Sequence, residues 1–283
     1  MQEKSALNFP FNTQVQEKSV ENGSWIAVKA LIGRSFRVDS GKGGAGDILQ
    51  SDISHLQLNT LLAVVNMASW NLKELREKAA VFLNDAEKKE LIEFLDSFDW
   101  KSKAAYYHLL QADECFKPYA EMNEAQITKK LFSQDDKFQI ATRIREFSLA
   151  SAVMMANTLP DVLAQVLNVV SLSNRLKVND VTSGKVMKRM KPSLLREAFE
   201  TLIRSDESKY IKAFTNTIKH IHLVKPNYQL SMEDGFFHGV NFKAFSYRGQ
   251  LFPEVRDVEL ISIVKRHRTQ SIQFGEKINE TLR

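Results

Sequence analysis

The stretches DKFQIATRIREFSLASAVMMAN (residues 136–157) and PDVLAQVLNVVSL (residues 160–172) decide the fold class. Pro160 separates them at a position that suits the first turn of a helix. Apolar residues dominate 149–170, but polar residues such as Asn157 and Gln165 interrupt the run. Such interruptions favour two buried helices of a globular protein over a membrane span. We therefore expect a helical core here and no membrane insertion.

Helical periodicity continues on both sides of this pair. Apolar residues spaced three and four apart begin near Ser51 and recur along most of the chain. Good N-cap residues precede two of the segments, namely Asn84 or Asp85 and Ser205 or Asp206. The further helices expected from the pattern are 71–83, 84–98, 101–116 (ending before Pro118), 183–190, 192–204 and 205–221.

The pattern changes after residue 222. LVKPNYQLS (223–231) and VNFKAFSYRG (240–249) alternate apolar and polar residues and are rich in aromatics, which is typical of strands. MEDGFFHG (232–239) would join them, and 253–282 return to a helical pattern. The sequence therefore predicts a mainly α protein, a helical bundle over 51–283 with a small β-hairpin near the C-terminus.

Residues 1–50 are the least regular part, and we expect an irregular extension there. Gly41, Gly43 and Gly46 match G-x-G-x-x-G by letter, but no apolar strand leads in and no long helix follows. A flexible loop is the better interpretation. The N-terminus lacks the apolar stretch of a signal peptide, and a single cysteine, Cys115, fits a reducing compartment. We expect a cytoplasmic protein whose Cys115 is a half-buried helix residue rather than a nucleophile.

Positive charge is concentrated in one segment. The whole chain has a net charge of +5, yet Arg175–Lys225 contains 12 Lys+Arg and 5 Asp+Glu, so the remainder is slightly acidic. A basic segment can attract phosphate groups, although lysines on a solvated helix face give the same composition. The cations that we expect to contact nucleic acid are Lys188, Arg189, Lys209, Lys212 and Lys219.

The expected helix 205–221 has two distinct faces. On a helical wheel Ile211, Phe214, Ile218 and Ile221 form the buried stripe. Asn216 and His220 lie one turn apart on the opposite face, with Lys209 close by. His220 should therefore face solvent or a partner, while His222 points elsewhere.

TNTIKH (215–220) resembles the core of the HEPN domain superfamily, helical bundles that often act in RNA cleavage and antiviral defence. The family motif is an arginine followed four to six residues later by a histidine, commonly with a polar residue after the arginine. Asn216 matches the polar position and His220 the histidine, but Thr215 stands at the arginine position. None of the chain's histidines has an arginine four to six residues upstream. The resemblance covers about 135–283.

The resemblance implies a metal-independent endoribonuclease, of the defence or toxin kind, that pairs two copies of its motif in a homodimer. His220 would serve as acid or base and Asn216 would orient a phosphate or the imidazole. Thr215 cannot supply the fixed cation, so Lys219, Lys212, Arg143 or Arg145 would have to replace it. With the arginine missing, a non-catalytic helical module that binds a protein partner stays open, as does nucleic-acid binding without cleavage.

Other candidate sites are weaker. KRHR (265–268) places His267 among arginines, which would suit a phosphate, but a solvated helix face is the preferred interpretation. His238 is assigned to the hairpin turn, and His55 and His108 have no neighbour at metal-ligand spacing. We therefore predict no metal and no cofactor, with RNA as the expected ligand.

Overall fold

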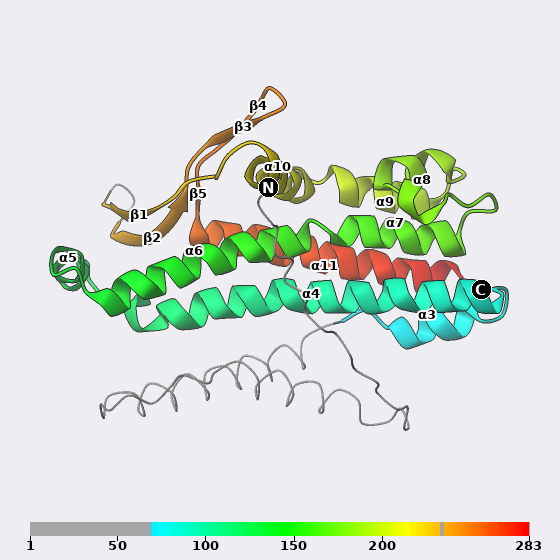
Figure 1. Ribbon diagram of the computed structural model, residues 1–283, viewed down its shortest axis with the longest axis horizontal. Coiled ribbons are helices and arrows are strands. Elements are labelled where there is room, and N and C mark those ends of the chain that lie inside the picture. The colour runs from blue at the N-terminus through cyan, green and yellow to red at the C-terminus, as the bar shows by residue number, and fades with distance from the viewer. Residues whose placement is uncertain (1–68, 233–234, 283) are drawn as a thin grey trace, which may run out of the picture. The chain divides into compact units, whose positions relative to one another are not determined.

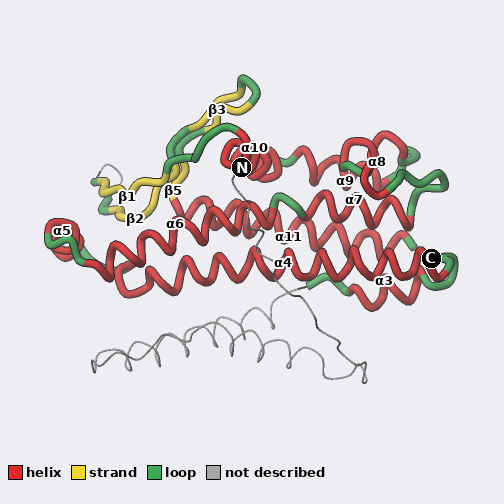
Figure 2. Tube along the Cα trace, viewed as in Figure 1, coloured by secondary structure: helices red, strands yellow, loops and turns green. Residues whose placement is uncertain are grey.

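The computed structural model describes residues 69–232 and 235–282. The expected extension over 1–50, the expected helix start over 51–68, the glycine-rich loop and His55 lie outside the described residues. Within them the protein is mainly helical, with a small antiparallel sheet between residues 226 and 256 (Figure 2). The predicted fold class is confirmed at this level.

Long helices packed side by side form the body of the fold. Figure 1 shows α4 running beside the successive helices α6 and α7, with α11 packed against the same group. The shorter helices α8, α9 and α10 follow α7 in the chain and lead to the sheet. The helices are α3 (Leu72–Ala79), α4 (Asp85–Ala120), α5 (Glu124–Phe132), α6 (Asp136–Ala156), α7 (Leu159–Val170), α8 (Ser183–Arg189), α9 (Leu194–Arg204), α10 (Asp206–His220) and α11 (Asp257–Thr281), with a 3₁₀ turn at Val178–Asp180.

The predicted break between helices 84–98 and 101–116 is wrong, because α4 is one continuous helix of 36 residues. Its buried side chains recur at helical spacing straight through the expected break, from Phe98 to Ser102 and Ala105. Pro118 lies inside the helix rather than after it. It removes one hydrogen bond of the ladder, and only two more helical residues follow it before α4 ends at Ala120.

The predicted helix starts are confirmed at the capping residues. The Asn84 side chain accepts a hydrogen bond from the Glu87 backbone N–H at 3.0 Å, and Glu87 bonds back to the Asn84 N–H. Ser205 caps α10 by accepting from the Ser208 N–H at 3.2 Å. Pro160 lies in the first turn of α7. Each cap satisfies an N–H group that the helix itself leaves unpaired.

The sheet region contains two hairpins rather than the single one expected. Strand β1 (Pro226–Ser231) pairs antiparallel with β2 (Phe237–Phe242), and β2 pairs with the short β5 (Val255–Arg256). The expected strand 240–249 is divided, because β3 (Phe245–Tyr247) turns back at once into β4 (Gln250–Phe252). Arg248 and Gly249 form that two-residue turn with φ of 51° and 78°. Positive φ at both positions is the geometry of a tight hairpin.

Apolar side chains form two large clusters and a small one. The first packs α3 and the start of α4 against α7, α9 and the end of α11, around Leu163, Phe199 and Ile278. The second packs α6, α10 and the start of α11 against the sheet, around Phe214 and Phe242. The third joins the end of α4 to α5 and the start of α6. Length and hydropathy alone would let Asp136–Val170 cross a membrane, yet 61% of its most apolar window is buried inside the fold.

Candidate functional site

Helix α10 carries the predicted site residues, and its buried face fixes their direction. Ile211 and Phe214 are 1% and 0% exposed and pack in the cluster formed by α6, α11 and the sheet. Phe214 lies edge-to-face against Phe242 with ring centroids 5.4 Å apart. Burial of these side chains stabilises one orientation of the helix. The opposite face is thereby turned outward.

The outward face of α10 presents Asn216 and His220. His220 is exposed in the last turn of the helix, and Asn216 is half-buried one turn earlier. The Asn216 amide donates to the Lys212 carbonyl of its own helix at 2.8 Å. His220 makes no hydrogen bond within the described part of the chain. The expectation that His220 faces away from the core is confirmed.

The predicted buried stripe is wrong at its C-terminal end. Ile218 is half-buried, and Ile221 is 57% exposed because α10 ends at His220 and the chain leaves the helix there. Leu223 is also 58% exposed. Two apolar side chains therefore lie on the surface directly after the histidine.

The predicted cations on α10 differ in their partners. Lys209 forms an exposed ion pair with Asp206, with Nζ and Oδ1 3.1 Å apart. Lys212 and Lys219 are exposed and have no carboxylate partner among the residues described. Their charge is therefore available to an external anion, whereas that of Lys209 is partly compensated.

The position aligned with the family arginine points inward. The Thr215 side chain is 0% exposed, and its hydroxyl has no hydrogen-bond partner among the described residues. An arginine there would have to bury its guanidinium or force α10 to rotate. Replacing Thr215 by arginine would therefore not place a guanidinium on the outward face of α10 beside His220.

The two arginines considered as replacements are engaged elsewhere. Arg145 is 6% exposed and donates from Nε to Asp257 at 2.7 Å, and it also lies over the Phe116 ring. Arg143 pairs with the buried Glu146 at 2.6 Å. Both arginines therefore neutralise carboxylates within the fold. Of the replacements considered for the arginine, only Lys212 and Lys219 have no carboxylate partner among the described residues.

Lys188 and Arg189 do not gather with the α10 residues. They belong to α8, which packs against α7 and α9, and they line two pockets that include no residue of α10. The structure thus divides the basic segment into two areas, one on α10 and one around α8.

Of the other histidines, His238 and His267 lie within the fold and His222 lies on the surface. The prediction that His238 lies in the hairpin turn is wrong. His238 lies within β2, where its Nδ1 is 2.7 Å from the Tyr228 hydroxyl. The solvated face predicted for KRHR is also wrong in part, since His267 is 0% and Arg268 7% exposed. His267 and Arg268 lie on the side of α11 that faces the core, while Lys265 and Arg266 are exposed. His222 is exposed, with Nδ1 3.1 Å from the Leu223 carbonyl.

Cys115 is half-buried on α4, as predicted. Burial raises the pKa of its thiol to about 11, so little thiolate forms at neutral pH. Burial likewise lowers the pKa of His108. No group of three or more His, Cys, Asp or Glu in the described ranges could hold a metal ion.

The α10 site can attract an anion and exchange a proton. Lys212 and Lys219 supply point charges, and His220 supplies an exposed imidazole that can accept or donate a proton. The site has no bidentate cation and no carboxylate beside the histidine among the described residues. Lys225 ends the basic segment but is not among the cations expected from the sequence to contact nucleic acid, and it is exposed just beyond the helix.

Comparison with known proteins adds no relative to this picture. No protein family, no curated protein and no solved structure matches the chain.

Proposed function

We propose that this protein acts on RNA through the outward face of α10, with His220 as the proton-transferring group of a metal-independent ribonuclease. The observation that carries the proposal is the placement of Asn216 and His220 one turn apart on that face. Two cations without carboxylate partners among the described residues lie beside them. The HEPN-like spacing of TNTIKH supports the same function.

The chemistry is an in-line transfer within the RNA strand. A base removes the proton of the ribose 2′-hydroxyl, and the oxygen attacks the adjacent phosphorus. The bond to the 5′-oxygen breaks, and an acid donates a proton to that leaving oxygen. The products are a 2′,3′-cyclic phosphate and a 5′-hydroxyl. His220 supplies one of the two proton transfers, and Lys212 and Lys219 hold the phosphate.

A second copy of the chain would supply the other proton transfer. Ile221 and Leu223 are more than half exposed beside His220, an arrangement that suits burial against a partner. Two α10 faces related by a twofold axis would bring two His220 side chains and four lysines together. We propose a homodimer of this kind, and sedimentation velocity should report a mass near twice that of the monomer.

Cleavage of RNA in EDTA tests the proposal. Purified protein is incubated with total RNA and with tRNA, beside His220→Ala and the matched control His222→Ala. His220→Ala should lower the cleavage rate by roughly 100-fold or more, the usual contribution of a general acid or base. His222→Ala should leave the rate nearly unchanged, since that imidazole is exposed outside the helix and bonded to the Leu223 carbonyl.

Equal cleavage by wild type and His220→Ala would refute the assignment. A double variant, Lys212→Ala with Lys219→Ala, should weaken RNA binding and reduce its dependence on salt. With two cations removed, binding releases fewer counterions from the RNA.

The alternative is a non-catalytic module that uses the same face to bind a protein. It is favoured by the burial of Thr215 at the arginine position. In that case the wild type would cleave no RNA, and His220→Ala would instead weaken the dimer or a protein complex.

A further inference from the structure

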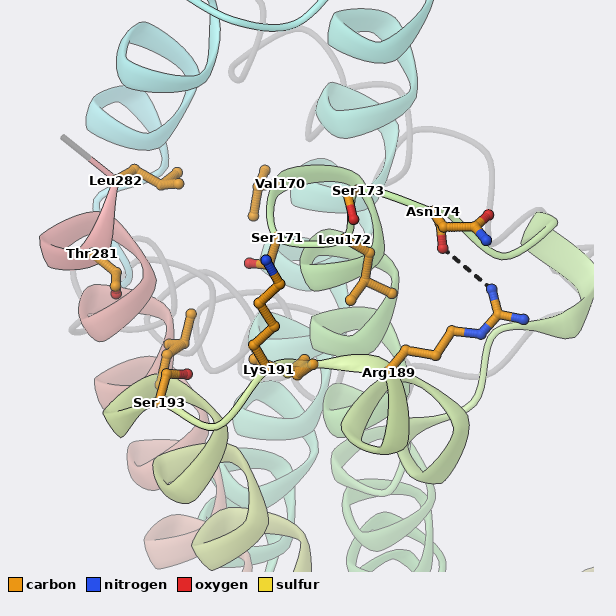
Figure 3. A pocket seen from close by; sticks show the side chains of 12 residues that line it. Val170, Ser171, Leu172, Ser173, Asn174, Arg189, Lys191, Ser193, Thr281 and Leu282 are labelled. Atoms are coloured by element: carbon orange, nitrogen blue, oxygen red, sulfur yellow. Dashed lines mark hydrogen bonds between the residues drawn. The ribbon is translucent and has the colours of Figure 1, made fainter.

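A second basic area lies around α8, away from the residues of α10. It includes an open pocket of about 680 Å³ between the loop after α7, the turn from α8 to α9, and the last turn of α11 (Figure 3). That volume is within the usual range for small-molecule sites. Three separate segments of the chain build its walls, so its shape depends on the folded core.

Positive charge on the pocket wall is uncompensated. Arg189 and Lys191 line it, and none of the described Asp or Glu side chains does. Neither cation forms an ion pair within the described ranges. Arg189 donates to the Asn174 carbonyl at 3.2 Å, which holds its guanidinium at the rim, and Lys191 extends toward Ser171 (Figure 3). The pocket therefore favours an anion.

Neutral donors surround the same space. The hydroxyls of Ser171 and Ser173 line the pocket and have no hydrogen-bond partner in the described part of the chain. Helix α9 begins at the wall, where Ser193 caps it by accepting from the Arg196 N–H at 3.2 Å. The cap leaves the backbone N–H groups of Leu194 and Leu195 without an acceptor among the described residues. Lys191, Ser171 and Ser173 can donate to oxygens of one ligand, and Arg189 joins them by turning away from the Asn174 carbonyl to which it is bonded (Figure 3).

The wall also has an apolar part. Leu172, Met190, Leu195 and Leu282 contribute to it, and the first three are buried. An anion alone would leave this surface uncovered. A tetrahedral anion carrying a carbon-rich group would use both the donors and the apolar wall. The guanidinium, the ammonium and the two hydroxyls suit the three terminal oxygens of a phosphate monoester better than a single carboxylate.

We propose that this pocket binds a phosphate monoester, held by Arg189, Lys191 and the Ser171 and Ser173 hydroxyls. Its source is either a small phosphorylated molecule or the phosphorylated end of an RNA strand, because both present the same group. The site is independent of His220 and stands whether or not α10 cleaves RNA.

Isothermal titration calorimetry of the full chain tests the pocket. The His220→Ala chain is used throughout, so that RNA remains intact and failure of the cleavage proposal does not affect the result. Adenosine monophosphate should bind saturably and at least tenfold more tightly than adenosine. Replacing both cations, in Arg189→Ala with Lys191→Ala, should weaken this binding at least tenfold.

A matched variant controls for overall charge. Lys185→Ala with Lys188→Ala removes the same two charges from the α8 region, but neither lysine lines this pocket. It should change adenosine monophosphate binding less than threefold. Equal loss in both double variants would overturn the proposal, since it would show attraction without a site. The proposal would also be overturned if neither adenosine monophosphate nor a 5′-phosphorylated RNA octamer bound saturably.

The source of the phosphate is decided by two octamers that differ only at the 5′ end. Tighter binding of the 5′-phosphorylated octamer than of its 5′-hydroxyl form, abolished by the Arg189 and Lys191 replacements, assigns the pocket to RNA ends. Equal binding of the two octamers, with adenosine monophosphate still bound, assigns it to small phosphorylated molecules.

Discussion

At the scale of single residues, Gly275 on α11 is fixed by the indole of Trp70. A Cβ atom at position 275 would lie 2.4 Å from the ring, and Trp70 itself is 3% exposed and donates from Nε1 to Asn279 at 2.9 Å. The ring cannot move aside without losing that hydrogen bond and its contact with Phe98. Only glycine lets the two segments approach so closely.

Gly275→Ala should therefore lower the free energy of unfolding by about 1–3 kcal/mol, the usual cost of overpacking a core. Urea denaturation of the wild type and the variant measures it. Gly184→Ala is the control, because a Cβ at that position meets nothing within 4 Å. A Gly275→Ala protein as stable as the wild type would contradict the close contact.

His267 is a second residue whose burial has a measurable consequence. Burial lowers the pKa of its imidazole to about 4, although the backbone of Ala156 and the carboxylate of Glu207 oppose the shift. Neither ring nitrogen has a hydrogen bond of normal geometry to any residue that the structure describes. The unfolded chain, with an ordinary histidine pKa near 6.5, takes up a proton before the folded one does. Stability contributed by the neutral ring is therefore lost as pH falls from about 6.5 toward 4.

This predicts that the wild type loses roughly 2–3 kcal/mol more than His267→Leu between pH 7.5 and pH 4.5. Urea midpoints at the two pH values give the difference, and other titrating groups such as Glu207 are common to both proteins. His222→Leu, which removes an exposed imidazole, should follow the wild type. Parallel pH profiles for the wild type and His267→Leu would exclude the neutral buried form.

At the scale of secondary-structure elements, Asp257 fastens the start of α11 to two neighbours. Its Oδ2 accepts from Arg145 of α6 at 2.7 Å and from the Val240 N–H of β2 at 3.0 Å. The pair is almost fully buried, with side chains 7% and 2% exposed. Replacing Asp257 by a neutral residue leaves the buried guanidinium of Arg145 without its main counter-charge.

Asp257→Asn should accordingly cost about 3–5 kcal/mol of unfolding free energy. Adding Arg145→Met to that variant should recover part of the loss, since the orphaned guanidinium is removed. Lys209→Met breaks an exposed pair and should leave the urea midpoint nearly unchanged. If Asp257→Asn were as mild as Lys209→Met, the buried pair would not stabilise the junction.

The elements themselves could largely be predicted from local sequence. Capping residues such as Asn84 and Ser205 and the helical apolar spacing determine most helix positions, because both signals act within a few residues. The break expected between 98 and 101 divides an apolar stripe that is in fact continuous through α4, and the end expected at 116 gave Pro118 too much weight. The second hairpin depends on a positive φ at Arg248. Positive φ is uncommon for residues other than glycine, so the sequence does not indicate a turn at this position.

At the scale of the whole molecule, the sequence predicts which residues are polar on a helix but not which segments meet. The outward direction of His220 follows from α10 alone. The burial of His267 and the pairing of Arg145 with Asp257, 112 residues apart, depend on tertiary packing and leave no local pattern. The α8 pocket combines residues from near positions 170, 190 and 281, so no single stretch of sequence indicates it.

The contacts of Trp70 and Asn71 with α11 also constrain how the chain can fold. Asn279 accepts from the Trp70 indole and donates to the Asn71 carbonyl, across more than 200 intervening residues. During synthesis, α3 is made long before the helix that it packs against. Its apolar residues, such as Leu75, can pack against α4 as soon as that helix is made, but their contacts with α11 form only after α11 has left the ribosome. Because closing so long a loop is entropically costly, the contacts between α3 and α11 should be among the last to form during folding.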